Sequence, residues 1–384
     1  MPRLAPKVGI HHVHRGGLVR HVALQVALMA LALALTLPPR VLQASAPAPR
    51  SAKTGEPSSG RRAASVVVAT VPGLLLHGSG HFVLGETKTA WRLLAMEGVG
   101  ASALLLGITS LALSGASNRF SVPSIWVATT GGGLFIGSWF ADIYGAAAGP
   151  DWAGAPVRLQ SRWWLSQSYR HVRNPALPGR HVSRTQAQVW RGRWALDADV
   201  QVLADDAQWH LQGALTHRFF GATADARATD GSFLDASVGY IHHRYGGFGT
   251  TEQFGSVALR ARYDLSRLGS TLAGTFLQGA WGVAMGASRY DRFGTEFADL
   301  LIAEARFGIY LGHDPAGWSE LSGFYRHRDD GIIGGIKMPG PGAGAIGHLG
   351  ATARIALHGS WGVVIEAAAG AARVFDIGVI YRPG

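Results

Sequence analysis

The sequence of 384 residues contains no cysteine. This absence excludes disulfide bonds, thiolate metal sites, a thiol nucleophile and the anchor cysteine of a lipoprotein. Charged residues are also scarce, at 15% where about a quarter is usual, whereas hydrophobic residues make up 47%. Such a composition excludes a disordered chain. Together with 53 glycines, it favours a membrane protein of the all-β kind over an ordinary enzyme.

Acidic residues are missing from the first 44 residues, which carry five of the positive charges behind the net charge of +11. The basic stretch 1–21 precedes an apolar run, Val22 to Leu37, that stops at two prolines. This run is short for a membrane span of about 20 residues. With the small residues Ala44-Ser45-Ala46 it predicts a signal peptide over 1–44; an uncleaved N-terminal anchor is the alternative. The positive charge therefore does not indicate a nucleic-acid partner.

Two further segments precede residue 150. Residues 45–65 are rich in proline, serine, alanine and glycine and predict a disordered linker. Residues 66–150 predict an apolar helical hairpin. Its first arm runs from Thr87 to about Leu113, a break follows up to Pro123, and the second arm begins at Ser124. Numerous glycines in both arms would let the two helices approach closely, and we expect the hairpin to pack beside or beneath the rest of the protein.

A short motif introduces the hairpin: Pro72-Gly73, then Gly78-x-Gly80-His81, then Gly85. It resembles uncharacterised bacterial outer-membrane β-barrel proteins with an N-terminal hairpin of this type, and the resemblance implies membrane association. His77 and His81 are four residues apart, as two metal ligands on one helical face would be. The glycines between them disfavour a helix, so we interpret both as loop or cap histidines at a membrane interface.

From about residue 160 to 384 the hydrophobic period changes from helical to two. Val257, Leu259 and Ala261, for example, alternate with Ala258 and Arg260. The predicted strands are 161–172, 181–191, 193–204, 207–220, 231–245, 252–266, 271–288, 297–311, 318–329, 347–358, 361–369 and 372–382. That makes twelve, or ten if the weak segments at the two ends are merged.

A soluble antiparallel sheet and a transmembrane barrel both show such alternation. The segments are longer than the usual soluble strand of about six residues, and aromatic residues mark many segment ends. These features predict a mainly β fold, an antiparallel up-and-down transmembrane barrel located in the outer membrane. Its expected partners are outer-membrane lipids and the barrel assembly machinery, although the chain ends Tyr381-Arg382-Pro383-Gly384 rather than on an aromatic residue. An inner-membrane hairpin bearing a soluble β domain is a further alternative.

Residues on the polar face of the strands are candidates for lining the lumen. They carry both signs, namely Asp197, Asp199, Asp264, Glu304, Glu320, Glu366, Arg260, Arg262, Arg306, Arg326, Arg328 and Arg354. A strongly ion-selective pore would show one dominant sign. The balanced set favours a cross-linked, plugged or narrow lumen, and hence a structural role or a passive narrow channel.

A lipid-modifying hydrolase is the enzymatic alternative, because such barrels pair a serine with a histidine base. Candidate residues are His210, His217, His242, His243, His327, His348 and His358, with Ser237, Ser256 and Ser322. No Gly-x-Ser-x-Gly elbow accompanies them, and the sequence has no Walker loop, dinucleotide fingerprint or metal motif. We therefore expect no cofactor, and a non-enzymatic role is favoured.

Overall fold

The structure is a computed structural model. It describes residues 58–114, 118–148, 161–174, 177–203, 208–223, 231–245, 249–291, 294–311, 319–327, 347–370 and 372–383. The chain from Glu56 to Gly384 forms one compact unit. The predicted signal peptide, most of the predicted linker and residues 328–346 lie outside the described residues.

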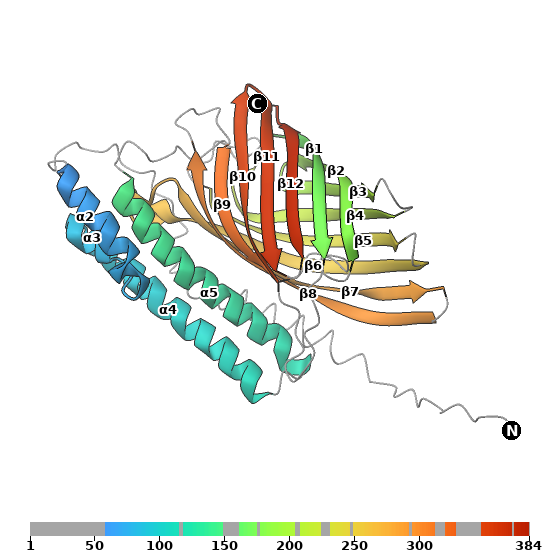
Figure 1. Cartoon of the computed structure of the whole chain (residues 1–384), viewed down its shortest axis with the longest axis horizontal. Helices are drawn as coiled ribbons and strands as arrows, with labels where there is room; N and C mark the ends of the chain where they lie inside the picture. Colours follow the sequence, from blue (N-terminus) through green and yellow to red (C-terminus); the bar gives the residue numbers. More distant parts are fainter. Residues whose placement is uncertain are drawn as a thin grey trace. The chain divides into compact units, whose positions relative to one another are not determined.

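Twelve antiparallel strands close into a barrel in which β1 pairs with β12 (Figure 1). The strands are β1 (Trp163–Asn174), β2 (Leu177–Arg191), β3 (Trp194–Leu203), β4 (Trp209–Gly221), β5 (Phe233–Tyr245), β6 (Thr250–Asp264), β7 (Thr275–Tyr290), β8 (Gly294–Leu311), β9 (Ser319–Arg326), β10 (His348–His358), β11 (Trp361–Gly370) and β12 (Arg373–Tyr381). Neighbours in sequence are neighbours in the barrel, so the predicted up-and-down fold with twelve strands is confirmed.

The two faces of the barrel differ in chemistry. On β3, Leu196 and Val200 are exposed, whereas Asp199 is buried. Arg262 on β6 contacts Glu320 on β9 although β7 and β8 lie between these strands, so the buried polar face is the inside of the barrel. The apolar exposed face is the outside, as lipid requires.

Aromatic rings gather on the outer face at the end where β1 begins and β12 ends. Trp163 and Trp361 both pack on Tyr381, with ring centroids 5.3 and 4.8 Å away. The side chains of Trp163 and Trp361 are exposed. Rings in this position form the belt by which a barrel contacts the membrane–water interface.

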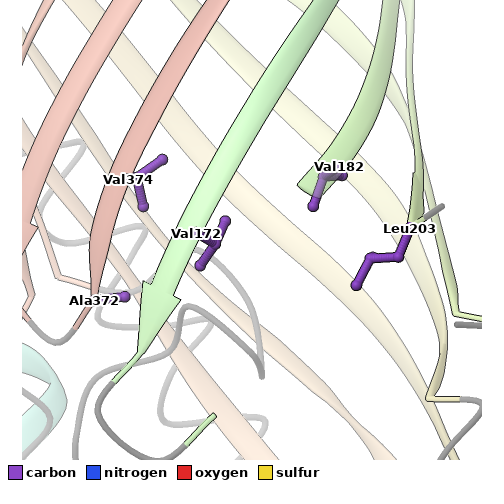
Figure 2. Packing of buried hydrophobic residues seen from close by; sticks show 5 residues of the cluster. All are labelled: Val172, Val182, Leu203, Ala372 and Val374. Carbon is purple, nitrogen blue, oxygen red and sulfur yellow. The ribbon is translucent and has the colours of Figure 1, made fainter. Parts of the chain in front are cut away.

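The inner face also carries apolar clusters at the two ends of the barrel. Figure 2 shows Val172, Val182, Leu203, Ala372 and Val374, which come from β1, β2, β3 and the region of β12. Towards the opposite end of β12, Ile380 packs with Phe276 and Tyr310, and all three are buried. The interior therefore carries clusters of apolar side chains near both ends of β12.

The connection between β6 and β7 differs from the prediction. Strand β7 begins at Thr275 and not at 271, because Leu265–Arg267 and Ser270–Leu272 form two single 3₁₀ turns, η5 and η6. Asp264 accepts a hydrogen bond from the backbone N–H of Ser266 at 2.9 Å, which caps the first of these turns.

The helical segment consists of α2 (Ser59–Thr70), the 3₁₀ turn η2 (Pro72–Leu74), α3 (Ser79–Leu84), α4 (Thr87–Leu113) and α5 (Asn118–Ala147). Helix α2 overlaps the end of the predicted linker: Ser58 caps it and Ser65 is fully buried. Helix α5 begins six residues earlier than predicted and includes Pro123. Pro123 is the sixth residue of the helix and lies beyond its first turn, so it removes one intrahelical hydrogen bond and its ring crowds the carbonyl of residue i−4.

Helices α4 and α5 lie side by side and touch through glycines (Figure 1). A Cβ added at Gly131 would lie 2.3 Å from the backbone nitrogen of Leu104, and one at Gly107 would lie 2.6 Å from that of Ala128. No larger residue fits at these positions without separating the helices, which accounts for the small residues seen in both arms.

Helix α5 packs on the outer face of β7 and β8. Trp281 Nε1 donates a hydrogen bond of 2.8 Å to Thr130 Oγ1, and the rings of Phe140 and Phe307 are 5.7 Å apart. A Cβ added at Gly133 would come within 2.6 Å of the Ala305 Cβ. The helical segment therefore lies beside the barrel, against strands whose apolar residues would otherwise be exposed.

Candidate functional site: the barrel interior

The inner face of β8 and β9 carries a carboxylate shared by two arginines. Glu304 accepts hydrogen bonds from Arg306 Nε at 3.0 Å and from Arg326 Nε at 3.1 Å. Arg326 also lies 3.6 Å from a carboxylate oxygen of Glu366, across the intervening strand β10. Alternation along each strand turns these side chains inward, and closure of the barrel brings them together.

A second cluster spans more of the wall. Arg262 Nη1 on β6 donates to Glu320 Oε2 on β9 at 3.3 Å, and Arg354 Nη1 on β10 donates to the other oxygen at 3.1 Å. The guanidinium of Arg262 stacks 3.8 Å above the ring of Phe276 and reaches the hydroxyl of Tyr310 at 3.5 Å. The Arg262–Glu320 pair, with Phe276 and Tyr310 beside it, crosses the interior near one end of the barrel.

A third cluster consists mostly of residues that were not predicted from the sequence. Arg170 Nε donates to Asp376 at 2.9 Å, and Arg184 contacts both Asp376 at 3.5 Å and Asp199. Arg170 and Asp376 are nearly completely buried. Only Asp199 of this group was a candidate, because the first strands and β12 alternate weakly and their apolar side chains do not mark the outer face clearly.

A fourth pair lies on β4 and β5. Arg218 makes two hydrogen bonds to the carboxylate of Asp235, at 2.7 and 2.9 Å, and Arg260 approaches the same carboxylate at 3.3 Å. Arg218 also stacks on Trp190, with its guanidinium carbon 4.4 Å from the ring centroid. Arg260 was predicted as a candidate, whereas Arg218 and Asp235 were not.

The remaining candidates have other surroundings. Asp197 accepts hydrogen bonds from Gln188 at 2.5 Å and Thr216 at 3.0 Å, and has no arginine among these partners. Asp264 accepts from the backbone N–H of Gly231 at 3.0 Å and caps η5, so it holds turns at the end of β6. Arg328 lies outside the described residues.

The histidines and serines considered for a hydrolase have different surroundings. Ser322 Oγ accepts a hydrogen bond from Arg306 Nη1 at 3.1 Å, and His210 is buried on β4 with its ring 5.2 Å from that of His243. His358 is exposed at the end of β10. Among the described residues, no group of three or more histidine, aspartate or glutamate side chains is arranged to hold a metal ion.

A separate buried polar cluster explains the glycine motif of the helical segment. Asp142 on α5 accepts hydrogen bonds from the backbone N–H groups of Gly78 and Gly80, at 2.9 and 3.2 Å, and from His81 Nδ1 at 2.6 Å. Gly78 has a φ of 88° and a Cβ there would lie 2.4 Å from the carbonyl oxygen of Ala90, so only glycine fits.

The sequence interpretation placed the two histidines of this cluster in loops or caps at a membrane interface, and their position relative to the membrane stays a prediction. Both His77 and His81 are fully buried, and His77 Nδ1 lies 2.6 Å from Ser138 Oγ. The chain wraps around the Asp142 carboxylate, and this buries the side chains of residues 77–81. His81 belongs to the short helix α3, which the glycines did not prevent.

The arginines and carboxylates of the interior pair with one another. A buried charge is tolerated when it is paired and hydrogen-bonded, and each carboxylate at the centre of a cluster, namely Glu304, Glu320, Asp376 and Asp235, accepts a hydrogen bond from an arginine. In the third cluster Asp376 Oδ1 and Arg170 Nη2 are buried without a hydrogen-bond partner. The arrangement can hold the wall of the barrel together and restrict the space inside it.

No family model and no curated protein matches the sequence. Solved structures overlap with the barrel part. The KdgM porin has a TM-score of 0.35 and 9% identity, with 57% of this chain and 99% of that chain covered. The β domain of the Bordetella autotransporter BrkA has a TM-score of 0.31 and 15% identity, with 58% and 98% covered. Omp33 of Acinetobacter baumannii has a TM-score of 0.29 and 7% identity, with 58% and 99% covered.

The class assignment follows from the architecture of the barrel itself. A closed barrel with an even number of antiparallel strands, an apolar outside and a polar inside is how β proteins cross the bacterial outer membrane. The protein is an outer-membrane β-barrel with an N-terminal helical segment, as its sequence predicts.

Proposed function

We propose that the protein is a passive barrel with a narrow lumen, which admits only ions and small solutes. The observation that carries this proposal is the contact between Arg262 on β6 and Glu320 on β9. Three strand spacings separate these strands, about 14 Å along the sheet at ~4.8 Å per spacing. Side chains that meet from strands so far apart stand in the path of anything passing through.

The charges of the interior support weak ion selectivity. The inner-face charges described above comprise eight carboxylates (Asp197, Asp199, Asp235, Asp264, Glu304, Glu320, Glu366 and Asp376) and eight arginines (Arg170, Arg184, Arg218, Arg260, Arg262, Arg306, Arg326 and Arg354), so neither sign dominates among these described residues. A filter that selects strongly for anions or cations needs a ring of one sign. The paired charges favour a passive conduit over a selective one.

A purely structural role is the second form of this proposal. The inner apolar cluster of Phe276, Tyr310 and Ile380 lies at the same end as the Arg262–Glu320 pair. If these side chains fill the cross-section, the barrel conducts nothing and serves the envelope as a rigid membrane body.

Planar-bilayer recordings with the purified full chain test the channel. We expect small, weakly selective unitary currents for the wild type and larger currents for Arg262→Ala. That variant leaves Glu320 paired with Arg354, so the carboxylate keeps a partner.

Arg260→Ala is the matched control. Arg260 lies two residues away on the same strand and its side chain is 39% exposed, and its partner Asp235 retains Arg218. Large wild-type currents would contradict a narrow lumen. Equal currents in all three proteins would show that Arg262 does not set the width, and silence in all three would leave the structural role.

A further inference from the structure

We propose that α4 is a lipid-facing helix: its outward surface contacts the acyl chains of the outer membrane beside β7 and β8. The protein would then cross the membrane with strands and also place a helix within the bilayer. This placement does not depend on whether the lumen conducts.

The position of α5 supplies the first support. It covers the outer face of β7 and β8, where Trp126 Nε1 donates to the carbonyl of Ile302 at 3.0 Å and Trp281 donates to Thr130 at 2.8 Å. That face is apolar and contacts lipid elsewhere around the barrel. A helix packed on it lies at the depth of the bilayer, and α4 lies against that helix.

The exposed surface of α4 supplies the second line of support for a lipid-facing helix. Leu105, Leu106 and Ile108 have exposed fractions of 65, 66 and 51%. No charged residue occurs between Gly98 and Leu113. Leaving a large apolar side chain in water forgoes about 1.5–3 kcal/mol relative to burying it, so this surface needs an apolar environment.

The charges of α4 lie near its start: Lys88 is exposed, and Arg92 and Glu97 have hydrogen-bond partners. Arg92 donates to the carbonyl of Leu268 in the β6–β7 turn, and Glu97 accepts from the backbone N–H of His77 at 2.9 Å. Glu86, just before the helix, accepts from Thr271 of the same turn at 2.8 Å. The polar end of α4 is thus fixed at one end of the barrel, and the uncharged remainder extends along the apolar wall.

Continuity with the barrel favours lipid over another protein as the occupant. Val257 on β6, Met285 on β7 and Phe297 on β8 are also exposed apolar residues of the outer face, so α4 extends an existing lipid-contacting surface. Among the described helices, only α4 is long and apolar enough to cross a membrane. Its 27 residues span about 40 Å at ~1.5 Å each, more than the apolar band of about 25 Å.

Fluorescence quenching by lipids tests the proposal, and the absence of cysteine gives a clean background. Leu106→Cys, Leu215→Cys and Arg191→Cys would each carry the same fluorophore in the full chain. Leu215 is an exposed outer-face residue of β4, 50% accessible, and serves as the lipid reference; Arg191 is exposed at the end of β2 and serves as the water reference. The purified variants are reconstituted in phosphatidylcholine vesicles with or without nitroxide at the middle of the acyl chain.

We expect quenching at position 106 to equal that at 215 and to exceed that at 191 several-fold. Quenching at 106 no greater than at 191 would overturn the proposal. Quenching at position 106 that appears only when the protein is diluted into more lipid would also overturn the proposal. A second copy of the protein would then cover α4 at the higher protein density. Heat-modifiable gel mobility checks folding, and Ser102→Cys, an exposed position on the same helix, replaces a variant that fails to fold.

Discussion

Replacing Asp142 with alanine should release the segment that carries the glycine motif. The carboxylate is fully buried and accepts from the backbone N–H groups of Gly78, Gly80 and His81, at 2.9, 3.2 and 3.3 Å, and from the His81 ring at 2.6 Å. In Asp142→Ala these four donors remain buried in a region packed around them and lose their acceptor.

The magnitude follows from those contacts. A hydrogen bond to a charged group contributes about 1.5–3 kcal/mol, and removal of one partner from a buried charged pair costs about 3–5 kcal/mol, since the single contributions do not add. We take about 4 kcal/mol. This corresponds to a ~10³-fold rise in the population of the open segment, at about 1.4 kcal/mol for each factor of ten.

Hydrogen–deuterium exchange of the full chain in detergent measures this population directly. Amides 78–81 should exchange at least a hundredfold faster in Asp142→Ala, whereas those of the barrel strands keep their wild-type rates. Ser102→Ala, on the exposed surface of α4, is the control and should change nothing. Wild-type exchange at 78–81 in the variant would refute the reasoning, because the carboxylate would then not hold the segment.

Two further predictions concern the helical segment. Gly131→Ala should lower the thermal unfolding temperature of the helices, because the added Cβ would lie 2.3 Å from the Leu104 nitrogen, and such a clash typically costs about 1–3 kcal/mol. The control Gly132→Ala, whose added Cβ would have its nearest neighbour at 3.8 Å, should be neutral or stabilising. Equal unfolding temperatures of the two variants would contradict the close contact at Gly131. Burial lowers the pKa of His77 despite the opposing attraction of Glu97, so the folded segment disfavours the protonated imidazole. The stability of the segment should therefore be full above about pH 6.5 and fall below it. Amide exchange rates from pH 8 to 5 in the wild type and in His77→Gln measure this, and an equal pH dependence in both proteins would rule it out.

Most of the fold follows from the sequence because lipid imposes a strict pattern. Every second residue of a strand must be apolar, so strands such as β6 and β8 show clear alternation, and the span of α4 is recognisable from its uninterrupted apolar composition. The start of α5 was not predicted because Pro123 suggests a break, whereas in the structure the helix begins at Asn118 and continues through this proline.

The contacts of the interior could be predicted only in part. Alternation indicates that Glu320 and Arg262 share the inner face, but it cannot indicate that they meet, since that depends on the closure and curvature of the barrel. The burial of His81 and Asp142 is a similar case: 61 residues separate them, and neither has a local pattern that points to the other.

The attachment of the helices to the β6–β7 turn has a consequence for the order of assembly. The bond between Glu86 and Thr271 joins residues 185 apart in sequence, and that between Arg92 and Leu268 joins residues 176 apart. The helices are synthesised first, yet the strands on which they dock emerge much later. Contacts of such sequence separation form slowly, and apolar segments that wait for them are prone to aggregate. The apolar helices α4 and α5 would therefore lack their docking surface until the middle of the barrel has formed.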